Sequence, residues 1–191
     1  MSRQRSEKRL ETERLLLRPP ENSDIAAITA FASDYAVSKN LARVPHPYTE
    51  DDAQSFVTRS AMLRAQGTDF SFAIVRKEGG LYLGGCGLHL RDNGLFELGY
   101  WLGQPHWGQG YATEAARKLA GFAFHCLKAV HITAGYFHDN PASGRVLEKL
   151  GFRPNGAANR DCLARGHTVY CLDMLLEREN FGRRPSNGQA A

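Results

Sequence analysis

The segment with the clearest chemical potential is a glycine-bearing loop at residues 107–113, with the sequence Trp-Gly-Gln-Gly-Tyr-Ala-Thr. It stands between a strand-like run and a long helical pattern. The free N–H groups and the positive dipole end of that helix would therefore face whatever the loop holds. Gly108 and Gly110 let the main chain approach a diphosphate without an intervening Cβ. The segment predicts a phosphate-binding loop, and the alternative is a turn that merely starts a helix.

Two other phosphate-binding patterns do not fit this loop. A Walker loop needs Lys and then Ser or Thr after its second glycine, where, counting from Gly103, the chain has Gln109 and Gly110. A dinucleotide fingerprint needs a third glycine where Thr113 stands and an acidic residue about twenty positions later, where residues 130–132 are Val-His-Ile. Both classes of nucleotide-binding protein are therefore excluded.

The cysteines and histidines give no pattern of metal ligands. The four cysteines include no C-x-x-C pair, so we expect no zinc site, no other metal and no disulfide. Cys126 falls on the apolar side of a predicted helix and Cys171 within a predicted strand, as small buried hydrophobic residues do. His46, His106 and His138 lie near the loop or near turns, and we expect each to be a surface or hydrogen-bonded histidine.

Hydrophobic periodicity places these residues on strands and helices. Strands are predicted at residues 12–18, 70–75, 81–90, 95–102, 130–137 and 168–176. Helices are predicted from about residue 25, from Thr49, over 112–126 and after Pro141. The sequence Asp92-Asn93-Gly94 predicts a tight hairpin. Antiparallel hairpins with one strand–helix–strand crossover predict an α/β (α+β) fold, with a mixed sheet and helices packed against it.

Composition is that of one globular domain. The 191 residues are 42% hydrophobic and 23% charged, and no apolar run is long enough to cross a bilayer. The basic N-terminus leads into no apolar signal-peptide core, so we expect a cytoplasmic protein with no membrane partner.

The formal charge of +4 is concentrated at the two ends of the chain. Residues 1–9 carry a net +3 and the segment after Phe181 carries +2, which leaves residues 10–181 near −1. We therefore expect disordered tails at 1–10 and 181–191 around one domain at 11–180. The tails could touch ribosomal RNA, but the folded part is expected to bind no specific nucleic acid.

Four blocks in a fixed order carry a resemblance to a known family. Residues 99–102 are Gly-Tyr-Trp-Leu, 107–115 are WGQGYATEA, 140–143 are Asn-Pro-Ala-Ser, and 148–152 are Glu-Lys-Leu-Gly-Phe. In this order and spacing the chain resembles the GNAT superfamily of N-acetyltransferases over about residues 12–177. With the opening Thr12-Glu13-Arg14-Leu15 and the turn Pro45-His46-Pro47-Tyr48, it is similar to the RimJ/RimL-like branch of ribosomal-protein N-terminal acetyltransferases.

The resemblance implies a mostly antiparallel GNAT-type sheet of about seven strands, flanked by about four helices, in which two parallel central strands splay apart. Acetyl-CoA, the implied cosubstrate, would enter between residues 95–102 and 130–137. Arg145 or Lys149 would contact a phosphate or the adenine. The residues implied to bind it are Tyr100, Trp101, Leu102, Trp107, Gly108, Gln109, Gly110, Tyr111, Ala112, Thr113, Asn140 and Ser143.

Two positions depart from the family pattern. The superfamily often has Arg or Gln three residues before the first loop glycine, where this chain has Pro105. Because the main chain makes most of the contacts there, binding should survive the change. Many members also carry a Tyr seven residues after the Asn, as an acid for the departing thiolate, and Leu147 excludes that role here.

Transfer of an acetyl group to an amine needs a neutral amine, a polarised carbonyl and a stabilised thiolate. A main-chain N–H around residues 98–100 could polarise the carbonyl. Glu97 is the candidate base, because across a two-residue turn it would face Leu90 and accept the amine proton through water; the alternative is a solvated strand residue. Ser143 is the second candidate catalytic residue, because a hydroxyl at a helix start could favour a thiolate; the alternative is a helix cap.

We therefore expect an N-acetyltransferase that moves acetyl from acetyl-CoA to a primary amine by direct attack in a ternary complex. The acceptor could be a protein N-terminus, as the branch suggests, or a small amine such as an antibiotic or a polyamine. Two other functions stay open: a non-catalytic acyl-CoA sensor, and a ribosome-binding module that uses Arg3, Arg5, Arg183 and Arg184. A homodimer is compatible with each of them.

Overall fold

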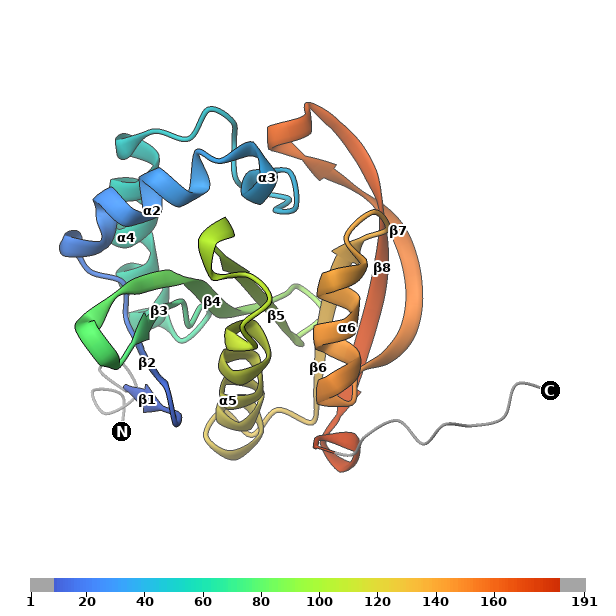
Figure 1. Cartoon of the computed structure of the whole chain (residues 1–191). Helices are drawn as coiled ribbons and strands as arrows, with labels where there is room; N and C mark the ends of the chain where they lie inside the picture. The colour runs from blue at the N-terminus through green and yellow to red at the C-terminus, as the bar shows by residue number, and fades with distance from the viewer. Residues whose placement is uncertain (1–8, 183–191) are drawn as a thin grey trace.

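The computed structural model describes residues 9–182, in which helices pack on both faces of one mixed sheet (Figure 1). The strands are β1 (Leu10–Glu11), β2 (Leu15–Arg18), β3 (Phe72–Arg76), β4 (Tyr82–Leu90), β5 (Phe96–Leu102), β6 (His131–Phe137), β7 (Arg153–Cys162) and β8 (His167–Glu177). The α-helices are α2 (Ile25–Ala32), α3 (Tyr35–Ser38), α4 (Glu50–Gln66), α5 (Tyr111–His125) and α6 (Pro141–Leu150). Short 3-10 helices are η1 (Asn22–Asp24), η2 (Glu78–Gly80), η3 (Gln104–His106), η4 (Leu163–Arg165) and η5 (Arg178–Asn180).

The centre of the sheet holds two parallel strands that separate. The strands lie in the order β1-β2-β3-β4-β5-β6-β8-β7, and every neighbouring pair is antiparallel except β5 and β6. Those two pair only where Phe96 meets Ile132 and Glu97 meets Thr133, although both strands continue. This confirms the predicted mixed fold with splayed central strands. The described residues form eight strands and five α-helices, against the predicted seven and four.

The two longest helices begin in different ways. α4 begins after Thr49, whose hydroxyl accepts the Asp52 N–H while the Asp52 carboxylate accepts the Thr49 N–H. This reciprocal cap satisfies N–H groups that a first helical turn leaves free. α5 begins after Gly110 with no side-chain cap, so its first N–H groups stay available to a ligand.

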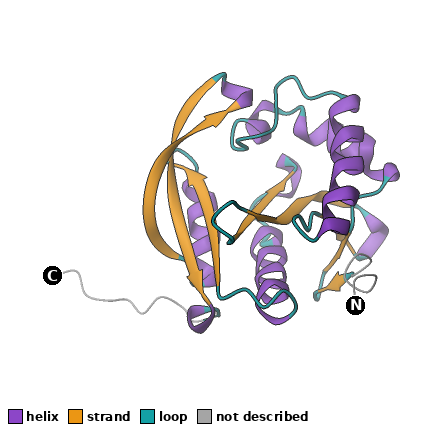
Figure 2. Ribbon diagram, turned by 180° about the vertical axis from the view of Figure 1, so that it is seen from behind, coloured by secondary structure: helices purple, strands orange, loops and turns teal. Residues whose placement is uncertain are grey.

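Apolar side chains on the two sheet faces hold the helices in place. α5 buries Ala115, Ala116 and Leu119 against inward residues of the central strands. On the opposite face, α2 and α4 bury Ile28 and Val57 against β3 and β4. Figure 2 shows helices on both sides of the curved strands. The gap between β5 and β6 therefore lies between two helical layers, each anchored by its own buried apolar surface.

The β4–β5 hairpin differs from its predicted register by one residue. Gly94 has a φ of 77°, and its N–H bonds to the Arg91 carbonyl. The loop is therefore three residues long, a tight turn followed by a left-handed glycine, and not the two-residue turn that Asn-Gly favours. Because of this extra residue, Glu97 faces His89 across the hairpin, and the prediction that it faces Leu90 is wrong.

The elements that the sequence did not predict are short or exposed. β7 is exposed along nearly its whole length, so it lacks the alternation that marks a half-buried strand. α3 and β1 are too short for a periodic pattern. The folded part also extends past the predicted limits of the domain, because Leu10 is buried in β1 and Phe181 packs against Phe124. The other residues of the predicted tails, 1–8 and 183–191, lie outside the described range.

Candidate active site

The predicted phosphate-binding loop presents a row of unused backbone donors. The N–H groups of residues 108–113 make no hydrogen bond within the described part of the chain. Gly108 and Gly110 have φ values of 74° and 82°, in the left-handed region that glycine reaches at little cost. No atom lies within 4 Å of the position that a Cβ on Gly108 would take. An open row of N–H groups at a helix N-terminus favours an anion.

The loop is fastened to the sheet through Glu114, in the first turn of α5. The Glu114 carboxylate accepts hydrogen bonds from the Thr12 hydroxyl at 2.5 Å, the Arg14 N–H at 3.0 Å and the Arg14 Nε at 2.8 Å. Arg14 Nη1 also donates to the Gln109 carbonyl at 3.1 Å. Burial alone would raise the pKa of Glu114, but these hydrogen bonds and the Arg14 charge hold it below its usual value. This fastening of the loop was not predicted from the sequence.

One edge of β5 directs its main-chain groups into the gap. The Gly103 N–H bonds to a carbonyl of β4, whereas the Leu102 carbonyl accepts the Trp107 indole N–H at 2.8 Å on the other side. Successive strand residues point their N–H and C=O groups to opposite edges, so those of Leu98 and Tyr100 point the same way as those of Leu102. The pairing with β6 has already ended there. These groups can therefore pair with an extended ligand.

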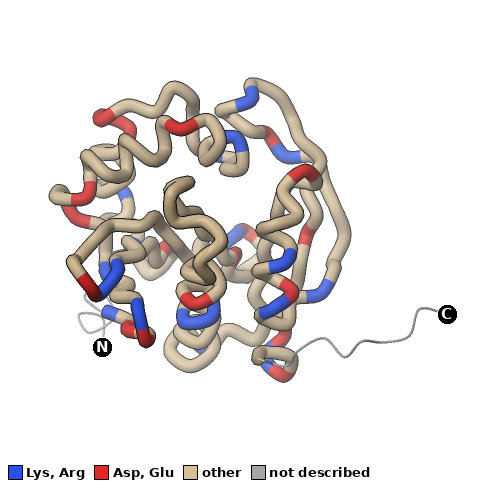
Figure 3. The backbone as a smooth tube through the Cα atoms, viewed as in Figure 1, with Lys and Arg blue, Asp and Glu red and all other residues tan. Residues whose placement is uncertain are grey.

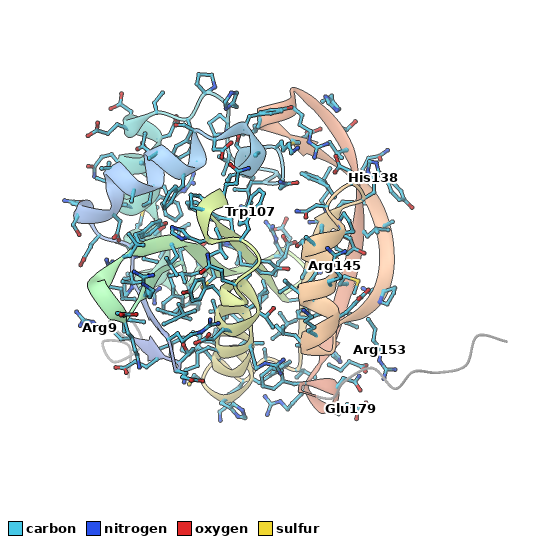
Figure 4. All side chains as sticks on the ribbon, viewed as in Figure 1. Arg9, Trp107, His138, Arg145, Arg153 and Glu179 are labelled. Atoms are coloured by element: carbon cyan, nitrogen blue, oxygen red, sulfur yellow. The ribbon has the colours of Figure 1, made fainter. Side chains whose placement is uncertain are left out.

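A cleft of about 1380 Å³ runs through the sheet at this gap. Tyr100 lines it from the α5 face of β5, and Glu97 and Trp101 line it from the α2–α4 face. Figure 4 labels two further residues at its border, Trp107 in the loop before α5 and Arg145 on the neighbouring α6. One cavity thus connects the predicted phosphate-binding loop with the face of β5 on which Glu97 lies.

Ser143 and Tyr100 meet on the α6 side of the cleft. Asn140 is the N-cap of α6, and its side-chain oxygen accepts the Ser143 N–H at 3.3 Å. Ser143 is therefore not the cap of this helix, which was the alternative to a catalytic role. Its hydroxyl lies 2.9 Å from the Tyr100 hydroxyl. Burial raises the pKa of Tyr100 well above its usual value, so this phenol keeps its proton at neutral pH.

Glu97 lies between two arginines. Its carboxylate pairs with Arg91 Nη2 at 2.6 Å and with Arg160 Nη1 at 3.3 Å, and Arg160 pairs in turn with Asp173. Burial alone would raise the pKa of Glu97, but the hydrogen bonds and charges of the two arginines hold it below its usual value. The carboxylate is therefore ionised at neutral pH, and its partners reduce its basicity.

An imidazole that no sequence motif predicted, that of His89, lies beside Glu97. His89 faces Glu97 across the hairpin, and its Nδ1 makes a short hydrogen bond to the Asp69 carboxylate. Nε2 lies over the two strands, 3.1 Å from where a Cβ on Gly87 would be and 3.9 Å from one on Gly99. A carboxylate at Nδ1 orients the ring so that Nε2 can take a proton. Since 20 positions separate the pair in the chain, no local spacing could reveal it.

Nearly all of the predicted site residues share the one cleft. Gln109 is the exception, because its side chain turns back to the Pro105 carbonyl at 3.0 Å. Tyr111 is largely buried, under the Arg14 guanidinium, so little of its side chain reaches the cleft. The predicted residues that line the cleft are Glu97, Tyr100, Trp101, Leu102, Trp107, Gly108, Gly110, Tyr111, Ala112, Thr113, Asn140 and Ser143.

Within residues 9–182, no three His, Cys, Asp or Glu side chains gather as metal ligands would, and none of the four cysteines is in a disulfide. No helix in the same range has both the length and the hydrophobicity to traverse a bilayer. Leu147, where a tyrosine acid was excluded, is buried in the core.

Known proteins share this sequence pattern and this fold. A model of the acetyltransferase (GNAT) domain matches residues 14–153. The uncharacterized N-acetyltransferase p20 of Bacillus licheniformis is 33% identical over 177 residues, which cover 91% of this chain and 98% of that one. Mycobacterium smegmatis RimJ, in complex with CoA-disulfide, has a TM-score of 0.77 at 21% identity, with 86% of this chain and 82% of that chain covered. Spermidine N-acetyltransferase from Vibrio cholerae, in complex with CoA and spermine, has a TM-score of 0.75 at 16% identity, with 88% and 98% covered.

Proposed function

The chain belongs to the GNAT family of acetyltransferases, and from that premise we propose that it transfers acetyl from acetyl-CoA to a primary amine by direct attack in a ternary complex. The observation that carries the proposal is the single cleft through the splayed strands. It joins the donor row of residues 108–113 to the face of β5 on which Glu97 lies. Two substrates could thus approach the same carbonyl from opposite faces of the sheet.

The features of the cleft suit acetyl-CoA, which when bound supplies an activated acyl carbon. The N–H groups of residues 108–113 suit its diphosphate, and the open edge of β5 at Leu98 and Tyr100 suits its extended amide-bearing arm. Arg145 and Lys149 also line the cleft, and we propose that they contact a phosphate or the adenine. These assignments rest on the donors of this chain and on its family.

We propose that Ser143 donates a hydrogen bond to the departing thiolate. Asn140 already caps α6, so the Ser143 hydroxyl is not needed for that purpose. Its place in the first helical turn exposes it to the positive end of the dipole, which favours a negative sulfur. The Tyr100 phenol, which keeps its proton, positions the Ser143 hydroxyl. The Leu147 side chain has no hydrogen-bond donor, so we propose that the Ser143 hydroxyl, held by Tyr100, stabilises the thiolate in place of a tyrosine acid.

The amine must lose a proton, and two neighbouring groups can take it. Glu97, the base predicted from the sequence, stays a candidate through a bridging water, although its arginine partners reduce its basicity. The geometry favours His89, because Asp69 orients the ring and leaves Nε2 beside the open part of β5. The amine nitrogen forms the C–N bond, the C–S electron pair leaves with sulfur, and one amine proton passes to the base.

We retain both classes of acceptor, a protein N-terminus and a small amine. A chain-terminal amine titrates near pH ~8 and is partly neutral at pH 7, whereas a lysine amine titrates near ~10.4. A terminal amine therefore needs less help from a base, which favours an N-terminus over a lysine side chain. The expected cytoplasmic location and homodimer stay predictions, and the ribosome contact concerns tails outside the described residues.

Release of free thiol from acetyl-CoA tests the proposed function. We expect release with at least one member of a panel of N-terminal peptides and small amines, and an acetylated product of matching mass. Both the enzyme and the acyl-CoA sensor should bind CoA, which calorimetric titration of the same sample checks, so thiol release is what separates them. Binding of CoA without thiol release for any amine would support a non-catalytic acyl-CoA sensor and reject acetyl transfer.

A further inference from the structure

Three arginines from different elements line what we call the acceptor half of the cleft, which comprises Arg43, Tyr48, Arg59, Arg91 and Glu97. Arg43 lies between α3 and α4, Arg59 lies on α4, and Arg91 directly follows β4. Burial and then the positive charge of Arg91 lower the pKa of Arg43; the charges of Glu97 and Asp69 oppose this, and Arg59 adds a smaller lowering. The fold thus brings like charges into one shared space.

Among the described residues, the acidic side chains of the cleft form no ion pair with Arg43 or Arg59, although the charges of Glu97 and Asp69 act favourably on Arg43. Each acid already has another partner: Glu97 pairs with Arg91 and Arg160, Asp69 with His89, and Asp139 with Arg165, while Asp52 caps α4 at Thr49. Within residues 9–182, Arg43 and Arg59 make no hydrogen bond or ion pair. Basic and acidic residues are both spread over the rest of the described backbone (Figure 3). A part of a cleft that is lined by arginines without ion-pair partners attracts an anionic group of a ligand.

We infer that the acceptor carries a carboxylate close to its amine, and that Arg43 and Arg59 bind this carboxylate. The inference rests on the proposed function and adds the class of substrate to it: an amine with its own acidic group, or a peptide N-terminus followed by acidic residues. A guanidinium offers N–H groups in a planar fork that matches the two carboxylate oxygens. Arg91 is committed to Glu97, so it contributes positive charge and not a free pair of donors.

The same charges disfavour a polycationic acceptor. A polyamine would place several ammonium groups beside Arg43, Arg59 and Arg91. Glu97 and Asp69 could not compensate, because each already pairs with a basic side chain. Juxtaposed like charges suppress the wrong partner. Although a spermidine acetyltransferase shares the fold, we expect this chain to discriminate against spermidine.

Acceptors that differ in charge alone test this inference. Three peptides of one length begin with alanine and continue with two aspartates, two asparagines or two lysines. A free amino acid paired with its amide, together with spermidine, forms the small-molecule arm. We expect kcat/KM to fall from the aspartate to the asparagine to the lysine peptide, by about tenfold overall, and the difference to shrink as salt is raised. Comparing the two arms tells whether the carboxylate belongs to a small molecule or to a peptide.

Variants of the two arginines connect the preference to the residues. Arg43→Gln with Arg59→Gln should bring the three peptides to similar rates, and Arg43→Glu with Arg59→Glu should invert their order. The matched control is Arg153→Glu, since Arg153 is an exposed arginine on β7 outside the cleft lining (Figure 4). This control should keep the preference of the parent chain.

Two readouts keep this inference separate from the proposed function. Turnover with equal rates for the aspartate and lysine peptides, or a preference for spermidine, would overturn the inference and leave acetyl transfer intact. If no amine is acetylated, the proposed function fails, and calorimetric binding of the same peptides with CoA present still decides the inference. Tighter binding of the aspartate peptide, lost in the double glutamine variant, would support it; equal binding would reject it.

Discussion

At the scale of single residues, the partners of a group decide which chemistry it can perform. Glu97 and Asp69 are both carboxylates on one face of the hairpin region, and in each the tendency of burial to raise the pKa is outweighed by basic neighbours. Arg91 and Arg160 hold Glu97 as an anion, whereas Asp69 orients the His89 ring. A carboxylate with two arginine partners mainly stabilises the fold through its ion pairs and is a weak base. An imidazole held at Nδ1 is better suited to receive a proton.

Glu97→Gln should lower stability in a pH-dependent way. The pKa of Glu97 is lower in the folded than in the unfolded chain, so its contribution is present above the unfolded pKa and is lost as the pH falls through the folded pKa. We expect the variant to be about 1–3 kcal/mol less stable at pH 7, with the difference shrinking below pH ~4.5. Denaturant titrations of both proteins at several pH values measure this. A difference that grows toward acid pH would contradict the ion-pair account.

His89→Gln should reduce turnover more than Glu97→Gln does. Loss of a general base costs about 10²–10⁴-fold in rate, and we expect kcat with the preferred acceptor to fall within that range while CoA affinity is unchanged. The kcat of Asp69→Asn should lie between those of His89→Gln and Glu97→Gln, because this variant loses the carboxylate that orients the His89 ring but keeps the ring itself. Steady-state rates of the three variants show whether His89 or Glu97 is the base. A fully active His89→Gln together with an inactive Glu97→Gln would return the role of base to Glu97.

At the scale of elements, the glycine-bearing loop at residues 107–113, proposed to bind phosphate, depends on a strand that is distant in sequence. Thr12 and Arg14, next to β2, bond to Glu114 at the start of α5, and Arg14 also bonds to the Gln109 carbonyl within the loop. These contacts hold a loop whose own N–H groups are left for a ligand. The β2 region is thus expected to pre-organise the row of donors, which lowers the cost of ordering it on binding.

Arg14→Gln should weaken acetyl-CoA binding and leave the chemical step alone. Without the guanidinium the loop loses its bonds to Glu114 and Gln109, so we expect KM for acetyl-CoA to rise about five- to tenfold at nearly constant kcat. Lys118→Gln is the matched control, because Lys118 is an exposed basic residue of α5 beyond its first turn. An unchanged KM in Arg14→Gln, or a fall in kcat alone, would show that the loop does not need this fastening.

At the scale of the whole molecule, the sequence predicted the fold and the place of the glycine-bearing loop before α5 because both depend on local patterns. Periodic apolar residues marked α5 and the central strands, and Gly108 and Gly110 marked the loop. The predicted hairpin register was wrong because Asn-Gly is compatible with a two- or a three-residue loop. Only long-range packing selects between these two loops. The His89–Asp69 pair could not be predicted at all, because it forms between segments that only the folded sheet brings together.

The central claim is that the gap between β5 and β6, with the donor row of residues 108–113 beside it, receives coenzyme A. Calorimetric titration of the purified chain with CoA tests this most directly. We expect one CoA bound per chain. The affinity should be unchanged in Glu97→Gln, because Glu97 lies on the α2–α4 face of β5, opposite to the face that α5 covers. Absence of binding by the folded chain would contradict the central claim.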